Sequence, residues 1–263
     1  MVALSLLLGG CGAAESLVGQ FGGGGKDEIL PGTREAVLKP NAPIVSDAES
    51  SEPVVIPAAV SNTSWTQAGG VASHAMHNLA LGSNLQRAFA VDVGYGSDSY
   101  GRLTATPIVA GGRVFVIDSR AEVLAVSAND GAAIWSRSLV PEDRDGRGAF
   151  GGGLATDGSR LYATTAFGEV AALDIATGNE IWRRQFESPI RGAPTVDGGR
   201  VYFATVSNDT FAISAEDGSQ IWRYQGIGEQ ASTLASPSPV VADGHVVVPH
   251  TTGELNAIRA DDG

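Results

Sequence analysis

Short apolar runs separated by glycine and acidic residues fill the second half of the chain. Between residues 193 and 225 four such runs occur, at 193–196, 200–206, 210–214 and 219–225. The breaks between the runs carry glycine, asparagine or aspartate, which supply the positive φ angles of tight hairpin turns. Runs such as Val246–Val248 are apolar at consecutive positions, so both faces of those strands are expected to be covered. The pattern predicts antiparallel meanders of four short strands.

This meander is one unit of an internal repeat. Its turn glycines lie at intervals of 47, 40 and 45 residues, at Gly131, Gly178, Gly218 and Gly263. All the variation in length falls between the last strand of one unit and the first strand of the next, which predicts a surface loop there. Four-stranded meanders that recur every ~40 to 50 residues are typical of propeller blades. The sequence therefore predicts an all-β fold, a β-propeller with about four blades in this chain.

Two residue types hold fixed places in the repeat. A tryptophan lies four residues after each of the first three turn glycines, at Trp135, Trp182 and Trp222. An alanine lies six residues before each of the four glycines, at Ala125, Ala172, Ala212 and Ala257. One interpretation is that the tryptophan of one blade docks into a notch left by the alanine of its neighbour. The other is that both residues belong to the core of their own blade. Under either interpretation they are structural residues and not a site.

The fourth unit stops at its turn glycine, and two explanations remain open. In the favoured one, the chain is the first part of an eight-bladed protein and is truncated at its C-terminus. In the other, a ring of four blades is complete, and residues 86–94 supply the outer strand of the last blade. Such closure would remove the exposed edges of the sheets.

The N-terminal segment has the pattern of an export signal. Its apolar run is too short to cross a bilayer, which takes about 20 residues, but it suits the hydrophobic part of a signal peptide. The stretch Leu8–Cys11 resembles the lipobox of bacterial lipoproteins, in which small residues precede a cysteine that becomes lipidated. Residues 12–62 are rich in glycine, proline, serine and acids, which predicts a flexible tether. The predicted organisation is a lipoprotein signal at 1–11, a tether at 12–62 and propeller repeats at 63–263.

Charge and cysteine content narrow the possible partners and cofactors. The chain has 17 basic and 29 acidic residues, a formal net charge of -12, which opposes binding to nucleic acid or to an anionic membrane surface. Cys11 is the only cysteine, so the chain forms neither an internal disulfide nor a metal site with several thiolates.

The other candidates for chemistry are weak. His74 and His77 are three residues apart, and His245 and His250 flank a predicted strand, but no carboxylates or thiolates lie at metal-binding spacing beside them. The glycine-rich stretch 94–101 imitates a phosphate loop, but no helix is predicted after it. No set of nucleophile, base and acid stands out. We therefore expect no catalytic residues, no metal site and no cofactor.

The repeat resembles that of quinoprotein-type propellers, most clearly at Ala172–Gly178 followed by Trp182. Together with the lipobox and the lead-in at 64–81, it is similar to the BamB family, the lipoproteins of the outer-membrane β-barrel assembly machinery. That resemblance implies an eight-bladed scaffold without enzymatic activity. It also implies lipid anchoring through Cys11 in the outer membrane, with the propeller facing the periplasm.

The same resemblance implies the partners. Loops between blades of this family bind the POTRA domains of the barrel subunit BamA, and other barrel-assembly subunits and unfolded outer-membrane proteins are further candidates. The matching contact loop is 226–236, and its candidate partner-binding residues are Gln230, Thr233 and Leu234.

Two alternative functions remain open. Quinoprotein dehydrogenases have the same repeat, and resemblance to them implies a quinone held against a disulfide of adjacent cysteines, with calcium nearby. Cys11 by itself cannot form that disulfide. The other alternative is a propeller that senses or binds a small ligand, which the sequence neither supports nor excludes. We expect a protein that is not an enzyme.

Overall fold

The structure describes the part of the chain that carries the repeats. The chain divides into two units, Met1–Val54 and Val55–Gly263, and only residues of the second are described. The predicted lipidation site Cys11 and the predicted contact residues Gln230, Thr233 and Leu234 lie outside the described residues, so they stay predictions. The predicted boundary after residue 11 also lies outside the described residues, and the boundary after residue 62 likewise stays a prediction. The computed structural model describes residues 55–99, 101–148, 150–228 and 237–263.

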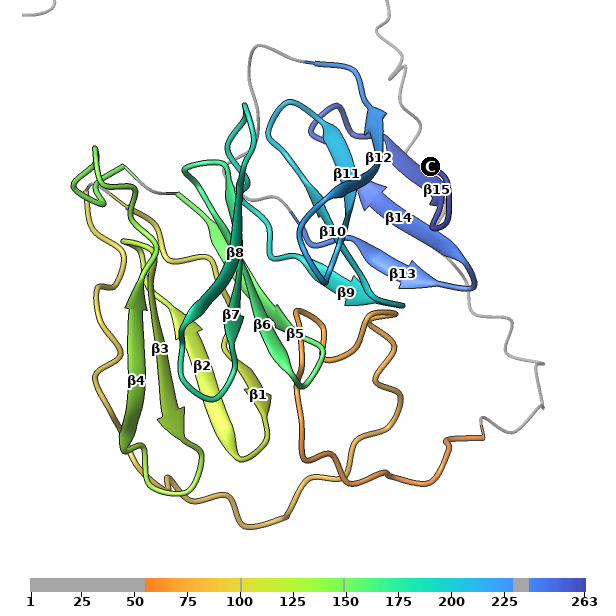
Figure 1. Cartoon of the computed structure of the whole chain (residues 1–263). Coiled ribbons are helices and arrows are strands. Elements are labelled where there is room, and N and C mark those ends of the chain that lie inside the picture. Colours follow the sequence, from red (N-terminus) through yellow and green to blue (C-terminus); the bar gives the residue numbers. More distant parts are fainter. Residues whose placement is uncertain (1–54, 100, 149, 229–236) are drawn as a thin grey trace, which may run out of the picture. The chain divides into compact units, whose positions relative to one another are not determined.

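The described residues form four antiparallel sheets, one for each repeat (Figure 1). Blade 1 contains β1 (Ile108–Ala110), β2 (Arg113–Ile117), β3 (Glu122–Ser127) and β4 (Ala133–Ser138). Blade 2 contains β5 (Gly152–Thr156), β6 (Arg160–Thr165), β7 (Glu169–Asp174) and β8 (Glu180–Gln185). Blade 3 contains β9 (Thr195–Asp197), β10 (Arg200–Ala204), β11 (Asp209–Ser214) and β12 (Gln220–Gln225). Blade 4 contains β13 (Val240–Ala242), β14 (His245–Pro249) and β15 (Leu255–Arg259).

The predicted all-β fold with four-stranded blades is confirmed. Consecutive strands pair in every sheet, and the first three sheets have four strands while the fourth has three. In blade 3 the strands follow the predicted runs, with ends shifted by a residue or two. For example, β10 ends at Ala204 because the next residue, Thr205, already begins the turn, its N–H bonding to the carbonyl of Asp209 at 2.9 Å. Among the described residues no helix is long and apolar enough to cross a membrane.

Each repeat tryptophan lies across a blade boundary. The indole Nε1 of Trp135 donates a hydrogen bond to the carbonyl oxygen of Ile175 in blade 2, at 3.2 Å. A Cβ added to Gly178 would lie 2.5 Å from the ring of Trp135, so the turn glycine of the next blade leaves the room that the indole fills. The equivalent hydrogen bonds, 3.2 and 3.0 Å long, join Trp182 to Ala215 and Trp222 to Ala260.

The repeat alanines do not form the notches in which the tryptophans of neighbouring blades dock, as one of our two interpretations had it. Three of them face the tryptophan of their own blade across a strand pair, in the pairs Ala125–Trp135, Ala172–Trp182 and Ala212–Trp222. Ala257 faces Val247. The notches that receive Trp135 and Trp182 are therefore made by the turn glycines of the neighbouring blades. At the third boundary a Cβ added to Gly263 would lie 3.4 Å from Trp222, an ordinary contact distance. The alanine instead leaves space beside the indole within its own sheet.

A segment before the repeats runs past the first strands of blades 1 and 2. Trp65 and Val109 of β1 exchange two backbone hydrogen bonds, both 2.7 Å long. One residue later, Thr66 accepts a hydrogen bond at 2.9 Å from the backbone N–H of Thr156 in β5. We call Trp65–Ala72 the crossing segment. It satisfies backbone groups that the sheets themselves leave unpaired.

The crossing segment continues past blades 3 and 4. The side-chain amide of Gln67 accepts a hydrogen bond from the N–H of Val196 in β9 at 2.8 Å and donates one to its carbonyl at 3.3 Å. The N–H of Val241 in β13 donates to the carbonyl of Ala72 at 2.8 Å. Gln67 is only 4% exposed, so these bonds form in the interior. One short peptide thus bonds to the first strand of all four described blades.

Residues 86–94, the candidate closing strand, form no strand in the structure. Phe89 instead lies over the turn glycine of blade 1, where a Cβ added to Gly131 would lie 2.7 Å from its ring. Trp135 lies over Gly178 in the same way. Phe89 therefore has the same place beside the turn glycine of blade 1 that Trp135 of the outer strand β4 has beside the turn glycine of blade 2.

Candidate interaction site

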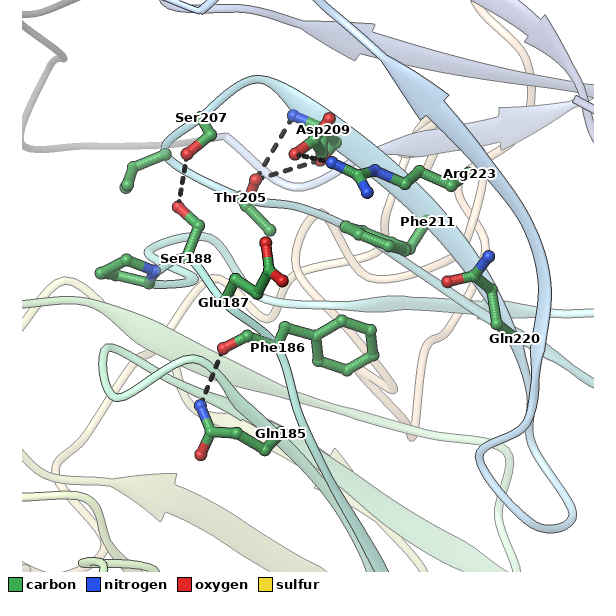
Figure 2. A pocket seen from close by; sticks show the side chains of 12 residues that line it. Gln185, Phe186, Glu187, Ser188, Thr205, Ser207, Asp209, Phe211, Gln220 and Arg223 are labelled. Atoms are coloured by element: carbon green, nitrogen blue, oxygen red, sulfur yellow. Dashed lines mark hydrogen bonds and ion pairs between the residues drawn. The ribbon is translucent and has the colours of Figure 1, made fainter.

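A cavity of about 670 Å³ lies between blades 2 and 3 (Figure 2). Its walls come from the connection after β8, from the turn between β10 and β11, and from the outer strand β12. A cavity of this size is in the range that proteins use for ligands or for side chains of a partner. Its lining consists of Gln185–Pro189, Thr205–Ser207, Asp209, Phe211, Gln220 and Arg223.

The base of the cavity rests on a cluster of three phenylalanines. The ring centroid of Phe186 lies 4.8 Å from that of Phe203 and 4.9 Å from that of Phe211. The rings of Phe203 and Phe211 are stacked at 5.3 Å. Phe186 and Phe211 line the cavity, while Phe203 is fully buried behind them. Aromatic pairs favour such tilted and offset arrangements, so the three rings stabilise one another and present an aromatic surface to the cavity.

The phenylalanine cluster is a departure from the repeat. Sequence reasoning missed it because a buried strand accepts phenylalanine as readily as valine or leucine. The signal was present, since comparing the repeat units position by position separates blade 3 from the other three. At the position of Phe211 the other blades carry Leu124, Ala171 and Asn256, and at the position of Phe203 they carry Val116, Ala163 and Val248.

An ion pair forms the upper wall of the cavity. Asp209 Oδ2 lies 2.9 Å from an Nη atom of Arg223. The guanidinium carbon of Arg223 also lies 5.5 Å from the ring centroid of Phe211, so the cation is held over the aromatic cluster. Asp209 is 7% exposed, and its Oδ1 has no hydrogen-bond partner among the described residues.

Blade 2 has the same ion pair with one more acid. Arg183 contacts Glu169 at 3.1 Å and Glu180 at 2.8 Å. Burial raises the pKa of Glu169 above its usual value, although Arg183 opposes the shift. In blade 3 the position of Glu180 is taken by Gln220, which lines the cavity. Arg223 therefore has one acidic neighbour where Arg183 has two.

The start of the predicted contact loop is anchored at the boundary of blades 3 and 4. The N–H of Gly226 donates to the carbonyl of Asn208 at 3.0 Å. The side-chain amide of Asn208 donates to the carbonyl of Ile227 at 2.7 Å, and its oxygen accepts from the N–H and hydroxyl of Thr251, both at 3.0 Å. Asn208 has a φ of 64°, a conformation that asparagine adopts more readily than most residues. The loop that we predict to contact a partner therefore leaves the propeller from a fixed point.

His250 is a packed residue of this boundary. Its ring stacks on Tyr224, with centroids 6.0 Å apart, and its Nε2 lies 3.2 Å from the hydroxyl of Thr210. The amide nitrogen of Asn256 lies 3.0 Å from Nδ1, which makes Nδ1 the acceptor and leaves the proton on Nε2. Burial lowers the pKa of His250.

The other histidines do not meet. His245 is exposed and lies 2.9 Å from the carbonyl of Asp243, while His77 is exposed in the lead-in. His74 is partly buried, and burial lowers its pKa. Among the described residues, no three His, Cys, Asp or Glu side chains come close enough together to hold a metal ion.

The start of the glycine-rich stretch, at Tyr95 and Gly96, is bound to blade 1. The carboxylate of Asp118 accepts a hydrogen bond from the N–H of Tyr95 at 2.9 Å, and the guanidinium of Arg120 lies 3.5 Å from the Tyr95 ring centroid. The hydroxyl of Ser119 donates to the carbonyl of Gly96 at 2.7 Å. Through these contacts Tyr95 and Gly96 cover the turn between β2 and β3.

Comparison with known proteins places these blades in a family. A family model described as outer membrane protein assembly factor BamB matches residues 119–263, more than half of the chain. The chain belongs to this family. An uncharacterised protein of Rickettsia prowazekii is 29% identical over 168 residues, which cover 64% of this chain and 40% of that protein. The outer membrane protein assembly factor BamB of Pseudomonas aeruginosa is 33% identical over 91 residues, which cover 33% of this chain and 24% of that protein.

Solved structures agree with the propeller architecture. A quinohemoprotein alcohol dehydrogenase, ADHIIG of Pseudomonas putida HK5, superimposes on 76% of this chain and 39% of its own, with a TM-score of 0.60 and 18% identity. At that identity the likeness shows the fold only. The chain spans less than half the length of the curated relatives described above.

Proposed function

We propose that this chain is the propeller part of a scaffold lipoprotein that assists the assembly and insertion of β-barrel proteins into the outer membrane. In this proposal it acts without enzymatic activity, by binding the POTRA domains of BamA. The observation that carries the proposal is the family match across residues 119–263. The tryptophans that bridge successive blades support it, because they hold the connections between blades in fixed positions.

Membrane attachment is the second part of the proposal. A lipid on Cys11 would hold the chain at the outer membrane, and residues 12–62 would let the propeller reach its partner in the periplasm. Growth of the expressing cells with an alkyne fatty acid tests this, since the full chain should become labelled and the Cys11→Ser variant should not. Absence of label on the unchanged chain would contradict lipidation.

Partner binding is tested with purified BamA POTRA domains. The full chain should bind them, and Leu234→Ala in the predicted contact loop should weaken binding by about tenfold if Leu234 is the apolar anchor. Leu85→Ala is the control, because it makes the same substitution at a leucine that is 70% exposed and lies before the repeats. If the POTRA domains do not bind the unchanged chain, this function is wrong.

The likeness to a quinohemoprotein dehydrogenase favours one second candidate, a quinone-dependent dehydrogenase. The described residues do not fit that cofactor well. The crossing segment bonds to the first strand of each described blade. Cys11 is the only cysteine of the sequence, so the disulfide of adjacent cysteines cannot form. Reduction of a redox dye by the full chain, with pyrroloquinoline quinone, calcium and a primary alcohol supplied, would favour the dehydrogenase over the scaffold.

A further inference from the structure

We propose that the cavity between blades 2 and 3 binds an aromatic side chain of an extended polypeptide, and that Arg223 holds the backbone of that polypeptide. The inference deepens the proposed function by naming a class of client. It rests on that function only in taking the ligand to be a polypeptide.

The base of the cavity selects an aromatic ring. Phe186 and Phe211 present ring faces and edges to a space of about 670 Å³. A further ring can add to such a cluster edge to face or offset, and it gains more than an aliphatic side chain of equal area. The cluster occurs at this blade boundary and not at the matching positions of the other described blades. Filling a repeat boundary does not by itself require phenylalanine at these positions.

The wall of the cavity supplies hydrogen-bond donors. Arg223 uses one Nη atom for Asp209, and within the described residues its guanidinium makes no further hydrogen bond. Its side chain is 42% exposed, against 26% for Arg183 in blade 2, where a second acid closes the same position. Because Gln220 at the position of Glu180 is uncharged, some guanidinium N–H groups of Arg223 beside the cavity have no partner among the described residues. Backbone carbonyl oxygens are suitable acceptors for them.

The edge of the sheet favours a polypeptide over a small aromatic molecule. β12 is the last strand of its sheet, and no described strand pairs with its outer edge. Gln220 and Arg223 of β12 line the cavity, so the unpaired edge runs beside it (Figure 2). An extended segment that pairs with an edge strand places alternate side chains on one face. Here that face opens onto the phenylalanines.

Charge argues against anionic ligands. The chain has a formal net charge of -12, and the charge of Arg223 is balanced by Asp209. Glu187 adds an exposed carboxylate to the lining. A phosphate or a nucleotide would therefore meet repulsion, whereas an uncharged peptide backbone would not.

The test uses two labelled peptides and the full chain. The probe is the octapeptide Ser-Thr-Val-Phe-Thr-Val-Ser-Thr with fluorescein at its N-terminus and an amide at its C-terminus, and the reference peptide has alanine in place of phenylalanine. Fluorescence anisotropy should show about tenfold tighter binding of the phenylalanine peptide. Equal binding of the two peptides, or no binding of either, overturns the proposal.

Three variants locate the binding. Gln220→Glu gives Arg223 the second acid that Arg183 has, and it should weaken binding of the phenylalanine peptide by about tenfold. Ala133→Glu is its matched control, because it adds the same charge at the same repeat position of blade 1, away from the cavity, and should leave binding unchanged. Phe186→Leu installs the residue of blade 1, Leu139, and should reduce the preference for phenylalanine over alanine. Thermal melting checks that each variant folds.

The outcomes separate this inference from the proposed function. If Gln220→Glu and Ala133→Glu weaken peptide binding equally, the cavity is not the site and the inference is wrong. Binding of BamA POTRA domains is measured on the same preparations. If the POTRA domains bind while the peptides do not, the inference fails and the scaffold function stands; if only the peptides bind, the inference stands without the partner that we propose.

Discussion

The indole Nε1 of Trp182 lies 3.2 Å from the carbonyl oxygen of Ala215, across the boundary between blades 2 and 3. The ring of Trp182 also fills the space above Gly218, where an added Cβ would lie 2.8 Å from it. The same outer strand continues into the connection that lines the cavity, Gln185–Pro189. The contact that joins the two blades therefore also fixes the walls of the candidate site.

Replacing Trp182 tests this junction. Trp182→Phe removes the hydrogen bond and part of the buried ring, and we expect the free energy of unfolding to fall by about 1–2 kcal/mol. Urea denaturation followed by circular dichroism measures the change. Ile181→Val is the control, because Ile181 is 45% exposed on the same strand and should change stability by less than about 0.5 kcal/mol. An effect of Trp182→Phe as small as that of the control would contradict a role in blade docking.

The crossing segment gives a second prediction. Gln67→Ala removes both hydrogen bonds to Val196 and leaves a buried N–H without a partner, so we expect a loss of about 2 kcal/mol of stability. Hydrogen exchange should show faster exchange of the Val196 amide in particular. Gln225→Ala serves as the control, because Gln225 is exposed and its side chain makes no hydrogen bond within the described residues. Unchanged protection of Val196 would show that Gln67 does not hold β9.

The repeat explains why the fold could be predicted from sequence. Each unit repeats the same turn glycine, and Trp135, Trp182 and Trp222 follow it at one spacing, so errors in any single unit are corrected by the others. The place of the alanines was not predictable in this way. A fixed spacing shows that Ala172 and Trp182 belong together, but it does not distinguish a pair within one blade from a contact between two blades.

The crossing segment and the cavity escaped sequence reasoning for different reasons. Trp65–Ala72 occurs once and has no period, and its hydrogen bonds join residues as far apart as Gln67 and Val196. No local pattern encodes such a path. Phe203 and Phe211 face each other on β10 and β11 within blade 3. Phe186 comes from the connection after β8 and joins them only when that connection packs against blade 3. The predictions for Cys11 and for the contact loop still depend on sequence.

Histidine protonation should link stability to pH. Burial lowers the pKa of His250 from its ordinary value of 6.5 in the folded chain, so the unfolded chain takes up the proton first as pH falls. Stability is then fully present above pH 6.5 and is lost progressively between pH 6.5 and the lowered pKa. Thermal melting between pH 8 and pH 5 measures this slope.

A variant separates the contribution of His250 to this slope from that of the partly buried His74. The pKa of His74 is lowered in the same direction, so both histidines contribute to the slope. His250→Gln keeps a polar side chain opposite Thr210 and Asn256 and should flatten the decline of stability between pH 6.5 and pH 5. His77→Gln, at an exposed histidine, should leave it unchanged. Equal slopes for the unchanged chain and His250→Gln would rule out this link.

Asp217 should link stability to pH in the acidic range. Its carboxylate accepts hydrogen bonds from the N–H of Ser219 at 3.0 Å and from its hydroxyl at 2.7 Å. These bonds lower the pKa of Asp217 to about 2, and the bond from the backbone N–H has the largest effect. A depressed pKa means that the ionised group stabilises the folded chain above its ordinary pKa of 3.8, and that this stability is lost as pH falls through about 2.

Asp217→Asn tests the sign of this link. The amide keeps an acceptor for Ser219 but carries no charge, so we expect a lower melting temperature than that of the unchanged chain at pH 7. The difference should shrink below pH 3.8 and disappear near pH 2, where the aspartate itself becomes protonated. Glu142→Gln, at an exposed glutamate in the loop after β4, is the control and should leave the melting temperature unchanged at each pH. A difference between Asp217→Asn and the unchanged chain that is the same at every pH would show that the variant acts through packing, and that the charge of Asp217 does not stabilise the turn beside Trp222.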